Sequence, residues 1–244
     1  MSQPPAAAAA PRVYRYLDLV MAAFVAVLIA SNIASAAKIV DWGVSLGALP
    51  LSFDAGTLLF PVSYIFGDIL TEVYGYRRAR RVIWTGFAAL ALTSLYFALV
   101  RAMPGAASWQ EYAGQAAYDS ILGGFSSGGI VDASLLAFLV GEFSNSVILA
   151  KLKLATGGKQ LWMRTIGSTL VGEAVDSLIF GFVATLAGVF PWEALASIVV
   201  ANYIFKVAIE VLMTPLTYRL VNALKKREAE DYFDRGTNFN PFSR

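Results

Sequence analysis

Long apolar runs dominate the chain, and this feature limits the folds it can adopt more than any other. Six runs follow one another, at residues 13–37, 51–74, 82–103, 130–150, 165–190 and 194–224. Each has at least about the 20 residues that an α-helix needs to cross a bilayer. The runs are continuous rather than alternating, which is typical of helices and not of membrane β-barrel strands. The sequence therefore predicts an all-α integral membrane protein with six transmembrane helices.

These runs form one predicted domain, residues 13–224, between two terminal segments. Residues 1–12 are rich in Pro and Ala and lack the features of a removable signal peptide, so we expect a flexible cytoplasmic N-terminus. Residues 225–244 are expected to form a cytoplasmic tail. Because residues 238–242 are apolar for a disordered end, the tail either is a solvated end or docks on the cytoplasmic mouth.

The composition agrees with a membrane protein and removes several kinds of function. Charged residues make up 15% of the chain, against about 25% in soluble domains. The chain has no Cys and no His, which excludes disulfides, thiolate metal sites and Ser-His or Cys-His nucleophiles. A net charge of +2 does not indicate a nucleic-acid partner. We expect no cofactor, and the chemistry must come from carboxylates, amides, hydroxyls, aromatic rings, Lys and Arg.

Basic residues indicate the orientation in the membrane. Most of the 19 Lys and Arg residues lie in the N-terminal segment, the 77–81 loop, the 151–164 region and the C-terminal end. Lys and Arg are retained on the cytoplasmic side of short loops. Both termini are therefore expected in the cytoplasm, in agreement with an even number of spans.

The segment at residues 106–129 is expected on the opposite side. It carries Trp109, Tyr112 and Tyr118 among small residues, followed by a glycine cluster at 123–129. It is either an interfacial flap with its aromatic rings at headgroup depth or an ordinary loop with no role in gating.

Acidic residues inside the predicted spans are the most unusual feature, because an ionised side chain at mid-membrane costs about 2.5–3.5 kcal/mol. There are eight of them: Asp18, Asp54, Asp68, Glu72, Glu142, Glu173, Asp176 and Glu210. Asp18 and Asp54 lie near span ends, and contact with interfacial water explains them. The other six need a cation, a hydrogen-bond donor, a bound ligand or a proton.

Spacing places several of these acids on shared helix faces. Asp68 and Glu72 are four residues apart, and Glu173 and Asp176 are three apart. Residues at these spacings lie on one face about a turn apart. Each pair therefore needs a cation, a donor or a ligand opposite it, or one member must bind a proton.

The last span carries a polar stripe at steps of four residues. Asn202, Lys206 and Glu210 present an amide, a cation and an anion in turn. One interpretation is a structural network in which Lys206 neutralises Glu210 or a neighbouring acid. The other is a site or pathway, which ionisable groups inside membranes often mark.

Short motifs recur in the two halves of the chain. Residues 31–38 and 144–151 each contain Ser-Asn followed by a Lys six residues after the Asn. Residues 67–72 and 172–176 each begin with Gly and an acid and end with a second acid. This recurrence favours an inverted repeat of three plus three helices, as in transporters with a site near the membrane midplane.

The side chains available suit the binding of a small polar solute. The amides of Asn32, Asn145 and Asn202 supply donors and acceptors. A flat ring could be covered by an aromatic side chain, with Phe53, Phe60, Tyr64, Trp84 and Phe180 as the candidates. A carboxylate reads adjacent N–H groups, such as the guanine edge, with both oxygens. Catalysis by an intramembrane aspartyl pair is the alternative, but a second half of such a site is not recognisable.

The motifs resemble the queuosine precursor transporter family, also called the vitamin uptake transporter family. The resemblance rests on residues 31–38, on 60–65 with Thr-Glu-Val-Tyr-Gly at 71–75, on the 202–215 stripe, and on the 231–242 tail with its Asn-Phe-Asn-Pro-Phe. It implies a six-helix bacterial inner-membrane importer of 7-deazaguanine precursors, chiefly 7-cyano-7-deazaguanine and its aminomethyl relative, for queuosine in tRNA. It also implies an architecture like that of vitamin-binding subunits, without an ATPase partner.

Combined with the acids, this resemblance predicts a substrate site. Glu173 or Asp176 would accept from the base, and Asn32 and Asn202 would complete its polar contacts. The same cavity would be lined by Asp68, Glu72 and Lys206. The ring would stack on Tyr64 or Phe180. A coupling or structural role is expected for Glu142, Asn145 and Glu210.

Two other functional classes are compatible with the sequence. The chain could be the binding subunit of an ATP-driven uptake complex, or an intramembrane enzyme. It contains neither a Walker motif nor a recognisable catalytic constellation, so we expect a transporter and not an enzyme. The coupling ion, the oligomeric state and the choice between cyano and aminomethyl substrates are not determined by the sequence, and a homo-oligomer is compatible with it.

Overall fold

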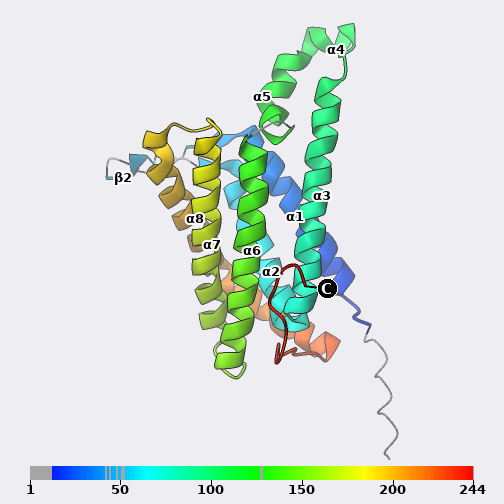
Figure 1. Ribbon diagram of the computed structural model, residues 1–244, viewed down its shortest axis with the longest axis vertical. Helices are drawn as coiled ribbons and strands as arrows, with labels where there is room; N and C mark the ends of the chain where they lie inside the picture. The colour runs from blue at the N-terminus through cyan, green and yellow to red at the C-terminus, as the bar shows by residue number, and fades with distance from the viewer. Residues whose placement is uncertain are drawn as a thin grey trace, which may run out of the picture.

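The computed structural model describes residues 13–41, 43, 45–47, 49–50, 53–126 and 129–243, so the predicted N-terminal segment 1–12 lies outside the described residues. It is a helical bundle with short strands at one end (Figure 1). The helices are α1 (Leu17–Ala37), η1 (Ala55–Leu58), α2 (Phe60–Ile69), η2 (Leu70–Tyr74), α3 (Tyr76–Ala102), α4 (Ala107–Tyr112), α5 (Gly114–Ser126), α6 (Gly129–Ala155), α7 (Leu161–Leu186), η3 (Trp192–Ala194) and α8 (Leu195–Glu228).

The strands form two short antiparallel pairs. β1 (Ile39–Val40) pairs with β4 (Phe53–Asp54), and β2 (Ser45–Leu46) pairs with β3 (Leu49–Pro50). They connect α1 to η1 at the end of the bundle opposite the C-terminus (Figure 1).

Five helices in the described part of the chain are long and apolar enough to cross a membrane: α1, α3, α6, α7 and α8. The helix inside the predicted second span is shorter than expected. Asp54 accepts from the backbone N–H of Thr57 and begins the 3₁₀ helix η1, and α2 starts only at Phe60 with Pro61 in its first turn. A mostly helical membrane protein is confirmed, whereas the count of six full spans stays a prediction.

The short helix α2 lies among other helices instead of facing lipid. Most of its residues are buried, and it contacts α1, α6 and α8. The five-residue π-helix η2 continues it to the turn before α3. A helix buried on all sides can carry polar groups inside a membrane protein only if neighbouring helices face them.

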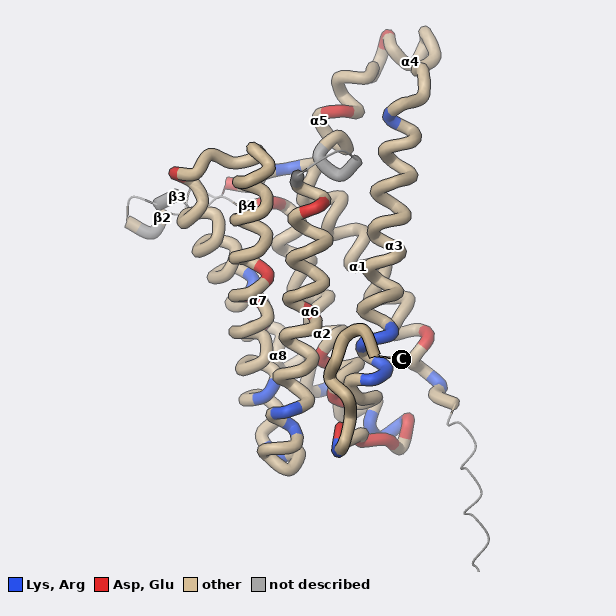
Figure 2. The backbone as a smooth tube through the Cα atoms, in the orientation of Figure 1, with Lys and Arg blue, Asp and Glu red and all other residues tan. Residues whose placement is uncertain are grey.

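The long helices extend beyond the predicted apolar runs at the end of the bundle where α1 begins and the C-terminal tail lies. α3 begins at Tyr76 instead of residue 82, so the basic 77–81 segment forms its first turns and is not a loop. Figure 2 shows Lys and Arg gathered at this end of the bundle. Basic residues are tolerated in these helix turns because their long aliphatic stems let the charged groups reach water beyond the helix end. The gathering agrees with a cytoplasmic end, and the cytoplasmic placement stays a prediction.

The 106–129 segment is helical at the other end of the bundle. It contains α4 and α5, and α5 packs against α1 and α3 (Figure 1). Tyr118 donates to the carbonyl of Phe97 at 2.9 Å, and Arg101 pairs with Asp119 at 2.8 Å. This hydrogen bond from Arg101 lowers the pKa of the Asp119 carboxyl. Of the predicted glycine cluster, Gly128 lies outside the described residues, and a role in gating stays a prediction.

The C-terminal tail docks on the first turns of α3. α8 ends at Glu228, four residues past the predicted end, and the chain then folds back. Trp84 Nε1 donates to the Pro241 carbonyl at 2.9 Å, and the Tyr76 hydroxyl donates to the Phe239 carbonyl at 3.0 Å. The structure therefore supports the docked alternative for this tail.

Asp234 gives the tail a capping function for α3. Its two carboxylate oxygens accept from the backbone N–H of Tyr76 at 3.1 and 3.0 Å, and one accepts from the Thr237 hydroxyl at 2.9 Å. Gly75, just before this helix, has a φ of +84°, and the ring of Tyr232 lies where a side chain would be. Only glycine fits this turn, so the helix has no capping side chain of its own.

We expect Asp234→Ala to lower the free energy of unfolding by about 1–2 kcal/mol, because the first N–H groups of α3 lose a buried cap. Thermal melting of the detergent-solubilised protein measures the loss. Arg235→Ala, an exposed neighbour, is the matched control. Equal melting temperatures for the two variants would contradict the cap.

Candidate functional site

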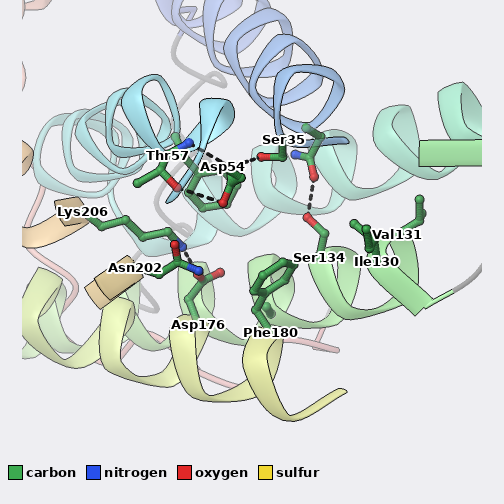
Figure 3. A pocket seen from close by; sticks show the side chains of 13 residues that line it. Ser35, Asp54, Thr57, Ile130, Val131, Ser134, Asp176, Phe180, Asn202 and Lys206 are labelled. Carbon is green, nitrogen blue, oxygen red and sulfur yellow. Dashed lines mark hydrogen bonds and ion pairs between the residues drawn. The ribbon is translucent and has the colours of Figure 1, made fainter. Parts of the chain in front are cut away.

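A pocket lies near the end of the bundle opposite the termini, where α1, α2, α6, α7 and α8 meet (Figure 3). Its volume is about 30 Å³, and a single water needs about 10–15 Å³ of such space. It adjoins an outer cavity of about 490 Å³ that shares Ser35, Asp54, Phe180 and Asn202 with it. The larger volume falls within the range of about 300–1,000 Å³ typical of small-molecule sites.

An ion pair between two helices forms one wall of the pocket. Lys206 Nζ on α8 donates to Asp176 Oδ2 on α7 (Figure 3) and lies 3.4 Å from Glu173 Oε2. It also lies 4.5 Å from the centre of the Phe60 ring. Lys206 thus neutralises acids of α7 and not Glu210 on its own helix.

Two asparagines line the pocket, and the hydrogen bonding of their side-chain amides differs. Asn202 is 5% exposed, and within the described part of the chain its side-chain amide makes no hydrogen bond. Asn32 is held, because its Nδ2 donates to the Leu28 carbonyl at 2.8 Å and its oxygen accepts from Ser134. Asn202 is therefore the amide that is ready to bind a ligand.

The aromatic residues correct one prediction. Phe180 lines the pocket as expected (Figure 3). Tyr64 does not, because it is fully buried below the pocket, with its ring centre 6.1 Å from that of Phe60. Phe60, one turn earlier on α2, occupies the place that was predicted for Tyr64.

The position of Glu72 corrects a second prediction. It does not line the pocket but lies in η2 at the opposite end of the bundle, bound to basic residues. Arg164 Nη2 and Lys225 Nζ donate to its Oε1 at 2.7 and 2.5 Å, and Lys153 Nζ lies 3.4 Å from the same atom. We call these four residues, with Asp231, the Glu72 cluster.

Asp231 connects the tail to this cluster. It accepts from Lys153 at 2.5 Å and pairs with Lys225 at 2.8 Å. Burial raises the pKa of Asp231, but the hydrogen bonds from the two lysines lower it by more, so the net pKa lies below its ordinary value. The cluster therefore joins η2, α6, α7, α8 and the tail.

Four more carboxylates lie between the pocket and the Glu72 cluster: Asp68, Glu142, Glu173 and Glu210. We call them the acid cluster. All are buried, and none lines the pocket. Asn145 Nδ2 donates to Asp68 Oδ1 at 2.8 Å, and the Thr169 hydroxyl donates to Glu210 Oε1 at 3.0 Å. The structure thus brings the predicted acids together but places them behind the pocket.

Comparisons with known proteins identify the family. The family described as "Putative vitamin uptake transporter" matches residues 54–220, more than half of the chain. The chain belongs to this family. The membership confirms the resemblance of its motifs, and it makes the protein a multi-pass protein of the bacterial inner membrane.

Two curated relatives are similar to this chain over most of its length. "Probable queuosine precursor transporter" of Bacillus subtilis (strain 168) is 27% identical over 169 residues, covering 69% of this chain and 71% of the relative. "Queuosine precursor transporter" of Escherichia coli (strain K12) is 26% identical over 178 residues, covering 72% and 76%. No solved structure matches the chain.

The pocket of this family member contains residues that sequence reasoning did not assign to it. Asp54 lines the pocket, but its oxygens accept from Ser35 at 2.5 Å and from the Thr57 N–H and hydroxyl at 3.0 and 2.9 Å. The Asp-Ala-Gly-Thr sequence is a helix-capping signal that could have identified this role. Ser134 carried no such signal, whereas Phe60 was among the aromatic residues expected to cover a flat ring.

We expect Glu72→Gln to lower the free energy of unfolding of the transporter by about 3–5 kcal/mol, because three cations are then left in the interior without their shared anion. Melting in detergent measures this. Glu193→Gln, which alters an exposed carboxylate in η3, is the control. Glu72→Gln combined with Arg164→Gln is expected to lose less than the sum of the two single variants, and strictly additive losses would show that the pair does not interact.

Proposed function

We propose that this chain imports a queuosine precursor, a 7-deazaguanine base, across the inner membrane. The observation that carries the proposal is the unpaired amide of Asn202 beside the Asp176–Lys206 pair, next to the rings of Phe60 and Phe180. Both curated relatives bear the name queuosine precursor transporter. The alternative of an intramembrane enzyme has no comparable support.

The pocket offers complementary groups for a guanine-like edge. Asp176 Oδ2 accepts from Lys206, and within the described residues this is the one hydrogen bond that its carboxylate makes, so Oδ1 is left for a ligand. That oxygen can accept an N–H of the base, while the Asn202 amide both donates and accepts. Phe60 and Phe180 lie where they can contact the faces of the ring. Because the inner pocket is small, we propose that the base binds at its junction with the outer cavity.

The two ends of the bundle differ in a way that suits transport. The pocket and outer cavity lie toward the end away from the termini, and the Glu72 cluster and the docked tail occupy the other end. With cytoplasmic termini this is an outward-facing arrangement. Import then requires the Glu72 cluster to open while the pocket closes, as in alternating access around a central site.

We further propose that the chain works without an ATP-hydrolysing partner. Its own tail covers part of the cytoplasmic end, through Trp84 and Tyr76. Exchange of labelled for unlabelled substrate by the purified chain in liposomes without ATP distinguishes this proposal from a binding subunit that needs an ATPase. Size-exclusion chromatography with light scattering on the same preparation gives its oligomeric state.

Asp176→Asn and Asn202→Ala are expected to reduce uptake of 7-cyano-7-deazaguanine at least about tenfold in cells that cannot synthesise it. Asp176→Asn removes the charge that strengthens the hydrogen bond from the base, and Asn202→Ala removes an amide that bonds to it; hydrogen bonds to charged groups are worth about 1.5–3 kcal/mol. Asn222→Ala, an exposed position on the same helix as Asn202, is the matched control. Wild-type uptake by both pocket variants at equal expression would refute this binding site.

The pocket should also discriminate between bases. At a concentration a hundred times its dissociation constant, a ligand stabilises the folded state by about 2.7 kcal/mol. We expect a clear rise in melting temperature with 7-cyano-7-deazaguanine and none with adenine, which presents an acceptor where guanine presents an N–H. Equal shifts for the two bases, or unchanged discrimination in Asp176→Asn, would contradict the assignment of Asp176.

A further inference from the structure

The acid cluster has too few cations for its charge. Four carboxylates, Asp68, Glu142, Glu173 and Glu210, are each at most 2% exposed. Among the described residues Lys206 is the one cation that pairs with any of them, through Glu173, and it also pairs with Asp176 in the pocket. Several ionised carboxylates with one shared cation are strongly unfavourable in a low-dielectric interior. Some of these groups must therefore carry protons.

Hydrogen bonding within the cluster leads to the same conclusion. Both oxygens of Glu142, Asp68 Oδ2 and Glu210 Oε2 are buried without a hydrogen-bond donor among the described residues. The Tyr64 hydroxyl and Asn145 Oδ1, buried beside them, are also unpaired. An ionised carboxylate only accepts, whereas a protonated one donates. Added protons would thus provide donors where acceptors face one another.

The cluster is built from four helices that pack closely. α2 contributes Asp68, α6 contributes Glu142, α7 contributes Glu173, and α8 contributes Glu210. Asp68 and Glu210 face each other across the contact of α2 with α8. At Gly67 a side-chain carbon would lie 2.6 Å from Glu142 Oε2, so the glycine provides the room that this carboxylate occupies.

All charged and titratable groups that face the cluster can be named by helix. They are Tyr64 and Asp68 on α2, with Glu72 beyond them in η2; Glu142 on α6; Glu173 and Asp176 on α7; and Lys206 and Glu210 on α8. The cations of the Glu72 cluster are already bound to Glu72. In the described part of the chain no group of acids has the arrangement of a metal site.

We propose that Asp68, Glu142, Glu173 and Glu210 form a proton-binding site and that Lys206 couples it to the pocket, so that substrate and proton enter together. The inference rests on the proposed transport function. Lys206 is the connection because it contacts Asp176 in the pocket and Glu173 in the cluster. A base that donates a hydrogen bond to Asp176 alters the position of this shared cation. The proton comes from the outer solution, is held on a carboxylate, and is released to the cytoplasm.

The test uses the purified full chain in liposomes with labelled 7-cyano-7-deazaguanine. With equal pH on both sides, wild type is expected to exchange labelled for internal unlabelled base. With the outside about one pH unit more acidic and the membrane potential clamped, it is expected to accumulate the base by up to about tenfold for one proton per substrate.

Glu142→Gln and Asp68→Asn separate the coupling from the binding of substrate. Neither residue lines the pocket. Both variants are expected to keep exchange within about twofold of wild type and to lose accumulation driven by the pH difference. Glu193→Gln, an exposed control, is expected to keep both. Accumulation by both cluster variants at the wild-type level would refute the assignment of the site.

Two measurements on the wild type decide the matter if a variant fails to fold. Addition of the base to lightly buffered proteoliposomes is expected to make the outer solution more alkaline as protons enter. Exchange without alkalinisation and without accumulation, or accumulation driven only by a sodium gradient, would overturn proton coupling and leave the transport function standing. Absence of exchange would overturn the transport function, and this inference with it.

Discussion

The Glu72 cluster holds the bundle together at one end, and the rest of the structure depends on it. A carboxylate with no exposed surface receives Arg164 from α7, Lys225 from α8 and Lys153 from α6. Removing charges from water is costly, and only dense mutual pairing compensates for it. Because this pairing joins the helices away from the pocket, the other end is free to form a cavity.

In the low-dielectric interior of the bundle, the role of each buried acid depends on the cations near it. Glu72 has three basic neighbours. Asp176 and Glu173 share Lys206, and Asp176 also lines the pocket. Glu142 has neither a cation nor a hydrogen-bond donor among the described residues. Carboxylates therefore join helices in the Glu72 cluster, and we propose that others bind the ligand or hold a proton.

Much of the fold and part of the site could be predicted from sequence. Apolar length identified five helices that can cross a membrane. The resemblance combined with the acids grouped Asn202, Lys206 and Asp176, and these three residues line one pocket. Four residues predicted for the site do not line the pocket, namely Tyr64, Asp68, Glu72 and Glu173, because spacing gives the face of a helix but not the depth at which a side chain lies. Tyr64 lies below the pocket, and Glu72 lies at the far end of the same helical segment.

The sequence by itself determined the class of protein, since apolar runs of this length are stable as helices in a bilayer. It also determined which residues need partners, because charges inside a membrane cannot stay isolated. Only the tertiary structure determined which residues those partners are. Lys206 and Glu210 are one turn apart on α8, yet Lys206 pairs with Asp176 on α7. The reason is physical: the distance between charges on different helices is set by how the helices pack, and helix periodicity carries no information about it.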